Sequence, residues 1–440
     1  MTALKFGRRW ITPQLISFGL VLPVLVMLRG PLLQDLGEWV YEARVGAWLV
    51  TTGDTSRFTV TPAPVPYVTA QALLTGLAVM LQPSLAGVAG ILITITLGSL
   101  ALGALIKEHR LPPLSAGVLL TLVVVLTSCF WNGYLGHQIG LALICAYLAL
   151  PRALRTHPAI VAGVTVAGFF THGMTWAALG VIAGAHGLVD RRLAQVAVGS
   201  LPSLGLLAWF VTSAASSSGD GELEVDGPLQ LAVYKAYTLA KMGGYQNLFV
   251  NGSGDGRALM LTGAAANCAF VAAFAALAVA AIVTATRSRS WRPELLAGLI
   301  LLGVALVMPP SLVEIVNPGE RLLSPSAICI AVAALAGGQH RMLGRAAATA
   351  AGLGLLLTAG SVALLPTKAA AGDPDHRDPT AGQASDATDR AGVLFQHRLD
   401  QYESRVAAAD ASWRAKASPT EPLIFKTTNL VNVTRPDLER

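Results

Sequence analysis

The sequence predicts an all-α polytopic membrane protein, and its composition carries that prediction. Hydrophobic residues make up 53% of the 440 residues and charged residues only 13%, with a mean hydropathy of +0.58. Soluble proteins carry roughly 25% charged residues, and a soluble core does not absorb this much apolar sequence. The net charge of +6 comes from short Lys/Arg clusters between apolar segments. That pattern orients membrane proteins, so it does not indicate nucleic-acid binding.

Apolar segments near the length that spans a bilayer, roughly 20 residues, predict about eleven transmembrane helices. The basic start and first apolar run are not followed by a small-residue cleavage site, so a retained helix is expected there rather than a signal peptide. The predicted spans are 11–29, 84–106, 113–131, 138–151, 158–171, 173–189, 195–213, 259–285, 294–310, 321–338 and 346–365.

Residues 66–82 are compatible with either a span or an interfacial helix. If they do not span, every strongly basic short connection falls on the same side, as the positive-inside rule requires. We therefore expect an interfacial helix at 66–82, a cytoplasmic N-terminus, an extracytoplasmic C-terminus and a multi-pass location in a bacterial-type plasma membrane. The basic connections contain Lys5/Arg8/Arg9, Lys107/Arg110, Arg152/Arg155, Arg191/Arg192, Arg287/Arg289/Arg292 and Arg341/Arg345.

The expected transmembrane domain covers residues 1–366. Residues 367–390 have the composition of a linker. Residues 391–440 are expected to form a short extracytoplasmic helical tail, which either docks on the outer loops or stays mobile.

Two outer loops are long, 30–83 and 214–258. The first is rich in Trp and Tyr, which favour the membrane interface, so interfacial helices are expected in it. In the second loop, Pro228–Met242 predicts a short helix. The basic residues of this loop, Lys235, Lys241 and Arg257, are expected to be solvated charges.

Ionisable side chains are rare inside the predicted spans, where a charge costs roughly 2.5–3.5 kcal/mol, and gather at the outer span ends. Asp35 and Glu38 follow the first span at a spacing of i, i+3, so both carboxylates share one helix face. Such a pair can serve as a general base or bind a metal. The alternative is a pair of solvated acids in the first turn of a helix.

His137 and His172 also lie at outer span ends, where imidazole can bind a metal or phosphate or transfer protons. The alternative is an interfacial imidazole bonded to a nearby carbonyl. Arg321 begins a span, which is unfavourable for the helix dipole, so an anionic partner is expected. That partner is Glu320, Glu314 or a ligand phosphate, and a local Glu320–Arg321 pair is the simplest choice.

The order of these motifs resembles the GT-C superfamily of membrane glycosyltransferases. A first span is followed by Asp35…Glu38-Trp39-Val-Tyr41-Glu-Ala-Arg44, then Gly53-Asp54, then the turn Pro62-Ala-Pro-Val-Pro66-Tyr67. Later, Glu320-Arg321-Leu-Leu-Ser-Pro325 is similar to the Arg-x-x-x-Pro pattern of that family. The resemblance covers about residues 5–365 and assigns no subfamily.

The resemblance implies an enzyme that takes a sugar from a polyprenyl-phosphate or polyprenyl-pyrophosphate carrier and passes it to a glycan, lipid or protein acceptor at the outer membrane face. It implies Asp35, with Glu38 second, as the catalytic carboxylate, acting as general base or metal ligand. Many family members have two adjacent acids, whereas this chain has Asp-Leu-Gly-Glu, so the use of a divalent metal stays open. The expected substrate-binding residues are Arg321, Glu320, His172, His137, Arg44 and Tyr67.

Two other functions fit the same sequence. A non-catalytic membrane subunit of a cell-envelope assembly keeps the fold without the chemistry, and it tolerates substitution of the two carboxylates. A ligase, polymerase or transporter of lipid-linked glycans depends on basic residues of 214–258 and not on Asp35.

Overall fold

The computed structural model describes residues 36–53, 58–60, 64–212, 227–246, 256–312, 315–338, 340–369 and 431–433. Within these residues the chain is helical apart from short strands of two or three residues. The helices are α2 (Leu36–Thr52), α3 (Val68–Met80), α4 (Pro83–Glu108), α5 (Pro113–Val124), α6 (Ser128–Trp131), α7 (Leu135–Leu148), α8 (Pro158–Thr171), α9 (Gly173–Val189), α10 (Leu193–Thr212), α11 (Gly227–Ala240), α12 (Gly256–Ser288), α13 (Pro293–Val307), α14 (Glu320–Leu335) and α15 (Arg341–Ala369). Single 3-10 turns cover Arg152–Leu154 and Ala336–Gly338.

Most helices follow the apolar segments, but the predicted span 113–131 is wrong as one continuous helix. In the structure α5 ends at Val124, and α6 is a separate short helix. The hydroxyl of Thr127 accepts a hydrogen bond from the backbone N–H of Phe130 at 3.0 Å and so caps α6. The predicted span 11–29 lies outside the described residues.

Four of the described helices are long and apolar enough to cross a membrane by length and composition: Leu85–Glu108, Leu193–Thr212, Met260–Ser288 and Arg341–Ser361. The other apolar helices in this part of the chain have 10–17 residues, fewer than the roughly 20 of a usual span. Large apolar side chains are exposed on these four helices, among them Leu100, Leu201, Val279 and Leu356. The described chain is therefore a helical structure with apolar surfaces suited to lipid.

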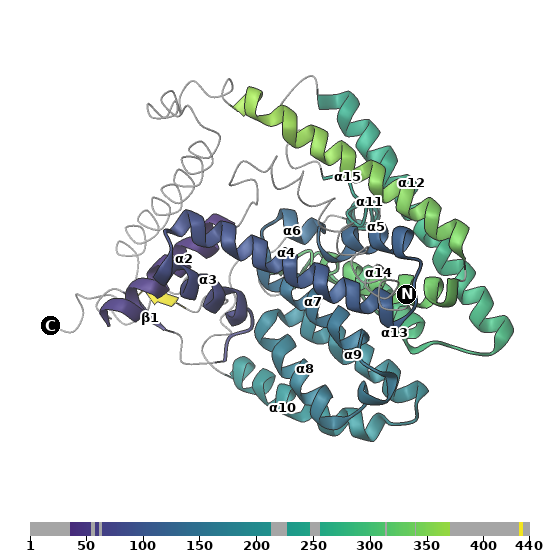
Figure 1. Cartoon of the computed structure of the whole chain (residues 1–440), viewed down its shortest axis with the longest axis horizontal. Coiled ribbons are helices and arrows are strands. Elements are labelled where there is room, and N and C mark those ends of the chain that lie inside the picture. Colours follow the sequence, from purple (N-terminus) through teal and green to yellow (C-terminus); the bar gives the residue numbers. More distant parts are fainter. Residues whose placement is uncertain are drawn as a thin grey trace, which may run out of the picture.

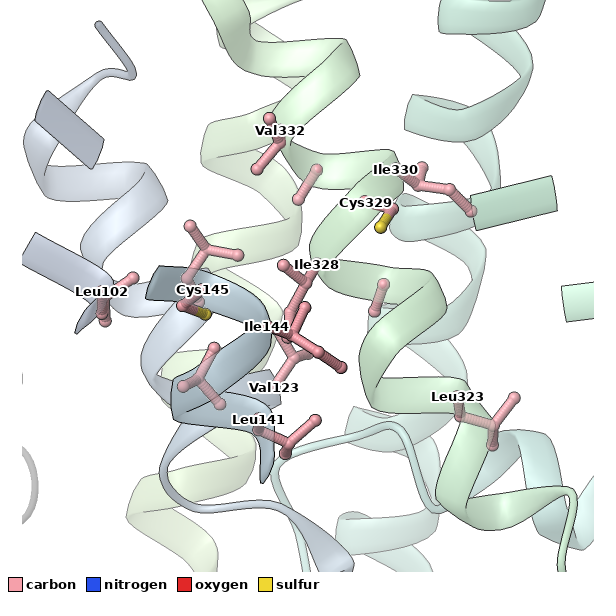
Figure 2. Close-up of a cluster of buried hydrophobic side chains, with 14 of the residues drawn as sticks. Leu102, Val123, Leu141, Ile144, Cys145, Leu323, Ile328, Cys329, Ile330 and Val332 are labelled. Atoms are coloured by element: carbon pink, nitrogen blue, oxygen red, sulfur yellow. The ribbon is translucent and has the colours of Figure 1, made fainter. Parts of the chain in front are cut away.

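Helix α14 lies at the centre of the packing and contacts α5, α7, α9, α12 and α13. From Leu322 to Leu335 its side chains are buried, apart from Ser324, which is partly buried. A helix that is apolar on all sides belongs in a core. Figure 2 shows Ile328 of α14 beside Ile144 of α7.

Around this centre the helices form three groups (Figure 1). Helices α8, α9 and α10 pack together, the long α12 and α15 pack along each other, and α2 pairs with α3. Strand β1 (Phe58–Val60) pairs antiparallel with β4 (Val431–Val433), so this part of the tail lies against the first long loop. Strands β2 (Ser311–Leu312) and β3 (Ile315–Val316) form a small hairpin.

The basic connections gather at one end of the structure. The Arg155 Nη2 atom lies 3.2 Å from His109 Nε2, which joins the connections after α4 and α7. Arg152 Nε donates to Asp190 Oδ1 at 3.0 Å, which adds the connection after α9. His340, before α15, lies 3.2 Å from a threonine hydroxyl near the end of α12. These contacts place the connections after α4, α7 and α9 together, and the end of α12 beside the start of α15. The first basic cluster, Lys5/Arg8/Arg9, lies outside the described residues.

Candidate functional site

At the opposite end of the bundle, four helices begin close together. Tyr67 precedes α3, Tyr134 precedes α7, His172 precedes α9, and α14 begins with Glu320 and Arg321. The N-terminus of a helix carries a partial positive charge. Neither Tyr67 nor Tyr134 caps its helix with a side-chain hydrogen bond. The helix dipoles alone therefore make this end of the bundle electropositive.

Aromatic and basic side chains meet here in what we call the Arg321 cluster: Tyr67, Tyr134, His137, His172 and Arg321. The ring centroids of Tyr67 and His172 lie 4.6 Å apart, and those of His137 and His172 lie 5.0 Å apart. The guanidinium carbon of Arg321 lies 4.6 Å from the ring centroid of Tyr134. Arg321 also interacts electrostatically with both histidines. Four of these residues are predicted by the sequence; Tyr134 is not.

Arg321 has no carboxylate within ion-pairing distance in the described part of the chain. The structural alternative, a local Glu320–Arg321 pair, is not formed, because Glu320 Oε2 accepts a hydrogen bond from Lys241 Nζ at 2.7 Å instead. Consecutive helical residues do not face each other, which explains why the two side chains part. Glu314 lies outside the described residues.

Tyr67 is held in a strained conformation at the edge of the cluster. Its φ angle of 83° is in the left-handed region, which bulky residues avoid. Such strain costs about 1–3 kcal/mol and gathers at functional sites. Burial raises the pKa of the Tyr67 hydroxyl, against the opposing effect of Arg321. The phenol therefore stays protonated and can donate a hydrogen bond.

The two histidines differ in their partners. His172 Nδ1 accepts a hydrogen bond from the backbone N–H of Met174 at 3.2 Å, so the proton of the neutral ring is on Nε2. His137 is fully buried, and neither of its ring nitrogens has a hydrogen-bond partner among the described residues. Leaving a buried polar group unpaired costs about 1–3 kcal/mol. His186, at the basic end, is likewise buried without a hydrogen-bond partner in the described part of the chain.

A second set of polar residues lies beside the cluster, on the side of α11. Besides the bond from Lys241, Glu320 Oε2 accepts one from Asn317 Nδ2 at 3.0 Å. Burial lowers the pKa of Lys241, but the carboxylate of Glu320 raises it, and the net shift is upward. The expectation of solvated lysines is wrong here, because Lys241 is paired and Lys235 donates to the backbone carbonyl of Met308.

The remaining predicted site residues are not part of this geometry. Asp35 lies outside the described residues, and so does the side chain of Glu38. Arg44 is exposed on α2. No group of three or more His, Cys, Asp or Glu residues within the described ranges is arranged to hold a metal ion.

The basic end contains a polar cluster that the sequence did not predict: the buried Arg155, Glu294 and His186 with the partly buried His109. Arg155 Nη1 donates to Glu294 Oε1 at 2.7 Å, and His186 Nε2 lies 3.7 Å from the same oxygen. Arg155 Nε also donates to the carbonyl of Leu150 at 2.9 Å. One signal was present in the sequence, because Glu294 is a lone acid at the start of an apolar segment.

Comparisons with protein-family models, with curated proteins and with solved structures found no match for this chain. The Arg321 cluster combines an arginine with hydrogen-bonding rings and helix N-termini. That combination suits a bound anion, above all a phosphate, which arginine can hold through two parallel hydrogen bonds.

Proposed function

We propose that this protein is a glycosyltransferase of the GT-C type, which moves a sugar from a polyprenyl-phosphate-type carrier to a glycan, lipid or protein acceptor of the cell envelope. The observation that supports it best is the place of Arg321, a cation without a carboxylate partner among the described residues, where four helices begin. The proposal includes the eleven spans, a bacterial-type plasma membrane and a site on the extracytoplasmic side.

A phosphate bound by Arg321 fits the chemistry of sugar transfer. The bond between the anomeric carbon and a phosphate oxygen breaks, so negative charge develops on the leaving lipid phosphate. Arg321 stabilises that charge, and the Tyr67 hydroxyl and the His172 Nε2–H group are further donors beside it. Donors fixed in advance where charge develops are a major source of rate enhancement.

The acceptor hydroxyl attacks the anomeric carbon from the opposite face and inverts it, while a base removes its proton. On the strength of the resemblance we assign this base to Asp35, with Glu38 in support. A divalent metal held by these two acids is the alternative role for them. On the strength of the same resemblance, we assign Arg44 to substrate binding.

The rival functions differ from this proposal in the residues that they need. A non-catalytic subunit tolerates loss of both carboxylates. A ligase, polymerase or transporter depends on the basic residues of 214–258, of which Lys241 is paired with Glu320.

The test is transfer by the purified full chain in lipid nanodiscs, with polyprenyl phosphates that carry radiolabelled mannose, glucose or arabinose and a membrane extract as acceptor. Arg321→Gln and Asp35→Asn should each lower the rate about 100-fold or more, as loss of a preorganised charge-stabilising group does. Asp190→Asn, at the other end of the bundle, should leave it unchanged. Full transfer by an Asp35→Asn/Glu38→Gln double variant contradicts the catalytic assignment of these two acids. Absence of transfer by the wild type with every donor favours the non-catalytic subunit.

A further inference from the structure

The carboxylate of Glu320 is satisfied on one side only. Its Oε2 atom accepts hydrogen bonds from Lys241 Nζ at 2.7 Å and from Asn317 Nδ2 at 3.0 Å. Its Oε1 atom is buried and has no partner among the described residues, and the residue is only 6% exposed. A buried carboxylate oxygen is a strong acceptor, and leaving it without a donor weakens the fold unless a ligand supplies one.

Helix α11 holds Lys241 in place through contacts with the chain on either side of the β2–β3 hairpin. The hydroxyl of Tyr234 donates to the carbonyl of Pro310 at 3.3 Å, and Lys235 donates to the carbonyl of Met308. The hydroxyl of Thr238 lies 3.3 Å from Asn317 Oδ1. The second long loop therefore fixes the orientation of the Glu320 carboxylate.

Glu320 lies directly beside the Arg321 cluster in the chain, although its side chain leaves α14 in a different direction from that of Arg321. The two residues are neighbours in the chain, so their Cα atoms are about 3.8 Å apart. The charges of Glu320, Arg321 and Lys241 all act on the buried thiol of Cys129, in α6. The unpaired carboxylate oxygen thus belongs to the residue next to the arginine that is proposed to bind the phosphate.

The partner that Oε1 needs is a neutral hydrogen-bond donor and not a cation. Lys241 already neutralises the charge of Glu320, and Arg321 adds a positive charge beside the pair. A second cation would therefore be attracted only weakly to this carboxylate. A hydroxyl group can donate a hydrogen bond to Oε1 without adding charge.

We propose that Glu320 Oε1 accepts a hydrogen bond from a sugar hydroxyl of a glycosylated lipid phosphate whose phosphate group lies against Arg321, and that Lys241 is the positioning residue for this carboxylate. The proposal rests on the proposed function, since it uses the same phosphate position. It gives α11 a role in recognising the sugar.

The test compares the affinity of the purified full chain in nanodiscs for bare polyprenyl phosphate with its affinity for the same lipid carrying mannose, glucose or arabinose. For at least one sugar, the wild type should bind the glycosylated lipid about tenfold more tightly, as one hydrogen bond to a charged group provides. Glu320→Gln should abolish this ratio but keep the affinity for the bare lipid, because Lys241 and Asn317 take the amide oxygen and leave the –NH2 group facing the sugar.

Lys241→Met should lower the affinity ratio as well, whereas Lys241→Arg should keep it. A general loss of folding would not produce this difference between the two substitutions. Lys107→Met, near the end of α4 at the basic end of the bundle, is the control for loss of a lysine and should keep the ratio. An unchanged ratio in Glu320→Gln overturns this inference, as does a wild type that prefers none of the sugars. Unchanged binding of both lipids by Arg321→Gln overturns the phosphate position in the proposed function instead, so the two failures are distinguishable.

Discussion

Arg155 Nη1 lies 2.7 Å from Glu294 Oε1, although 139 positions separate the two residues in the sequence. The side chains are only 4% and 7% exposed, so the pair is almost completely shielded from water. It ties the connection after α7 to the first turn of α13 at the basic end of the bundle. Charges buried in this way are held by their partners, because an unpaired charge in the interior is strongly unfavourable.

Glu294→Gln should therefore destabilise the protein by about 3–5 kcal/mol, since it leaves the Arg155 charge buried without compensation. The measurement is thermal or denaturant unfolding of the full chain in detergent micelles. Asp190→Asn is the matched control, because its pair with Arg152 is largely exposed on the arginine side and should contribute about 0–1 kcal/mol. An Arg155→Met/Glu294→Leu double variant should be more stable than Glu294→Gln; equal losses in all variants contradict the assignment of a buried ion pair.

Gly244 should not tolerate a side chain, because α15 passes directly against it. A Cβ atom there would lie 2.6 Å from the carbonyl oxygen of Ala351 and 2.9 Å from the backbone nitrogen of Leu355, and neither atom can move without the helix. Gly244→Ala should lower stability by about 1–3 kcal/mol in the same unfolding assay. Gly205→Ala is the control in α10, where nothing lies within 4 Å, and it should be neutral or stabilising. A stable Gly244→Ala variant argues against this contact.

The proposed sidedness can be tested at the two ends of the bundle. Leu229 is 77% exposed on α11, and Ser290 is exposed just after α12. Helix α12 has 33 residues and is about 50 Å long, enough to separate its two ends across a bilayer. In a variant without the exposed Cys268, a membrane-impermeant maleimide should label Leu229→Cys in intact cells and Ser290→Cys only after permeabilisation. The reverse result inverts the topology.

The sequence predicts helices best where an apolar run ends at a clear break. Pro158 starts α8, and His172 separates α8 from α9, so both bounds follow from the sequence. The break after Val124 is different, because the residues of the turn are themselves apolar and hydropathy does not distinguish them from helix. Local composition therefore locates apolar segments more reliably than it locates turns inside them.

The candidate site was predictable to the extent that it depends on single residues. An arginine at a helix start is unfavourable for the helix dipole, and at the outer end of a predicted span it gains nothing from the positive-inside rule. These two arguments together single out Arg321 from the sequence alone. The pairing of Lys241 with Glu320 depends on how α11 lies against α14, which no local pattern encodes. Tyr134 was missed for the same reason, since only packing places its ring against Arg321.

His137 offers a test that separates function from stability. Its ring nitrogens are buried and unpaired, so His137→Leu removes an unsatisfied polar group at similar volume and should stabilise the fold by about 1–3 kcal/mol. If the ring instead serves a ligand, the same change should lower affinity for polyprenyl phosphate. We expect both effects together, a higher unfolding midpoint and weaker binding. His109→Leu loses the hydrogen bond of Nε2, which is either donated to the Leu148 carbonyl or accepted from Arg155, and should destabilise without weakening binding. A stabilised His137→Leu protein with unchanged affinity removes this histidine from the site.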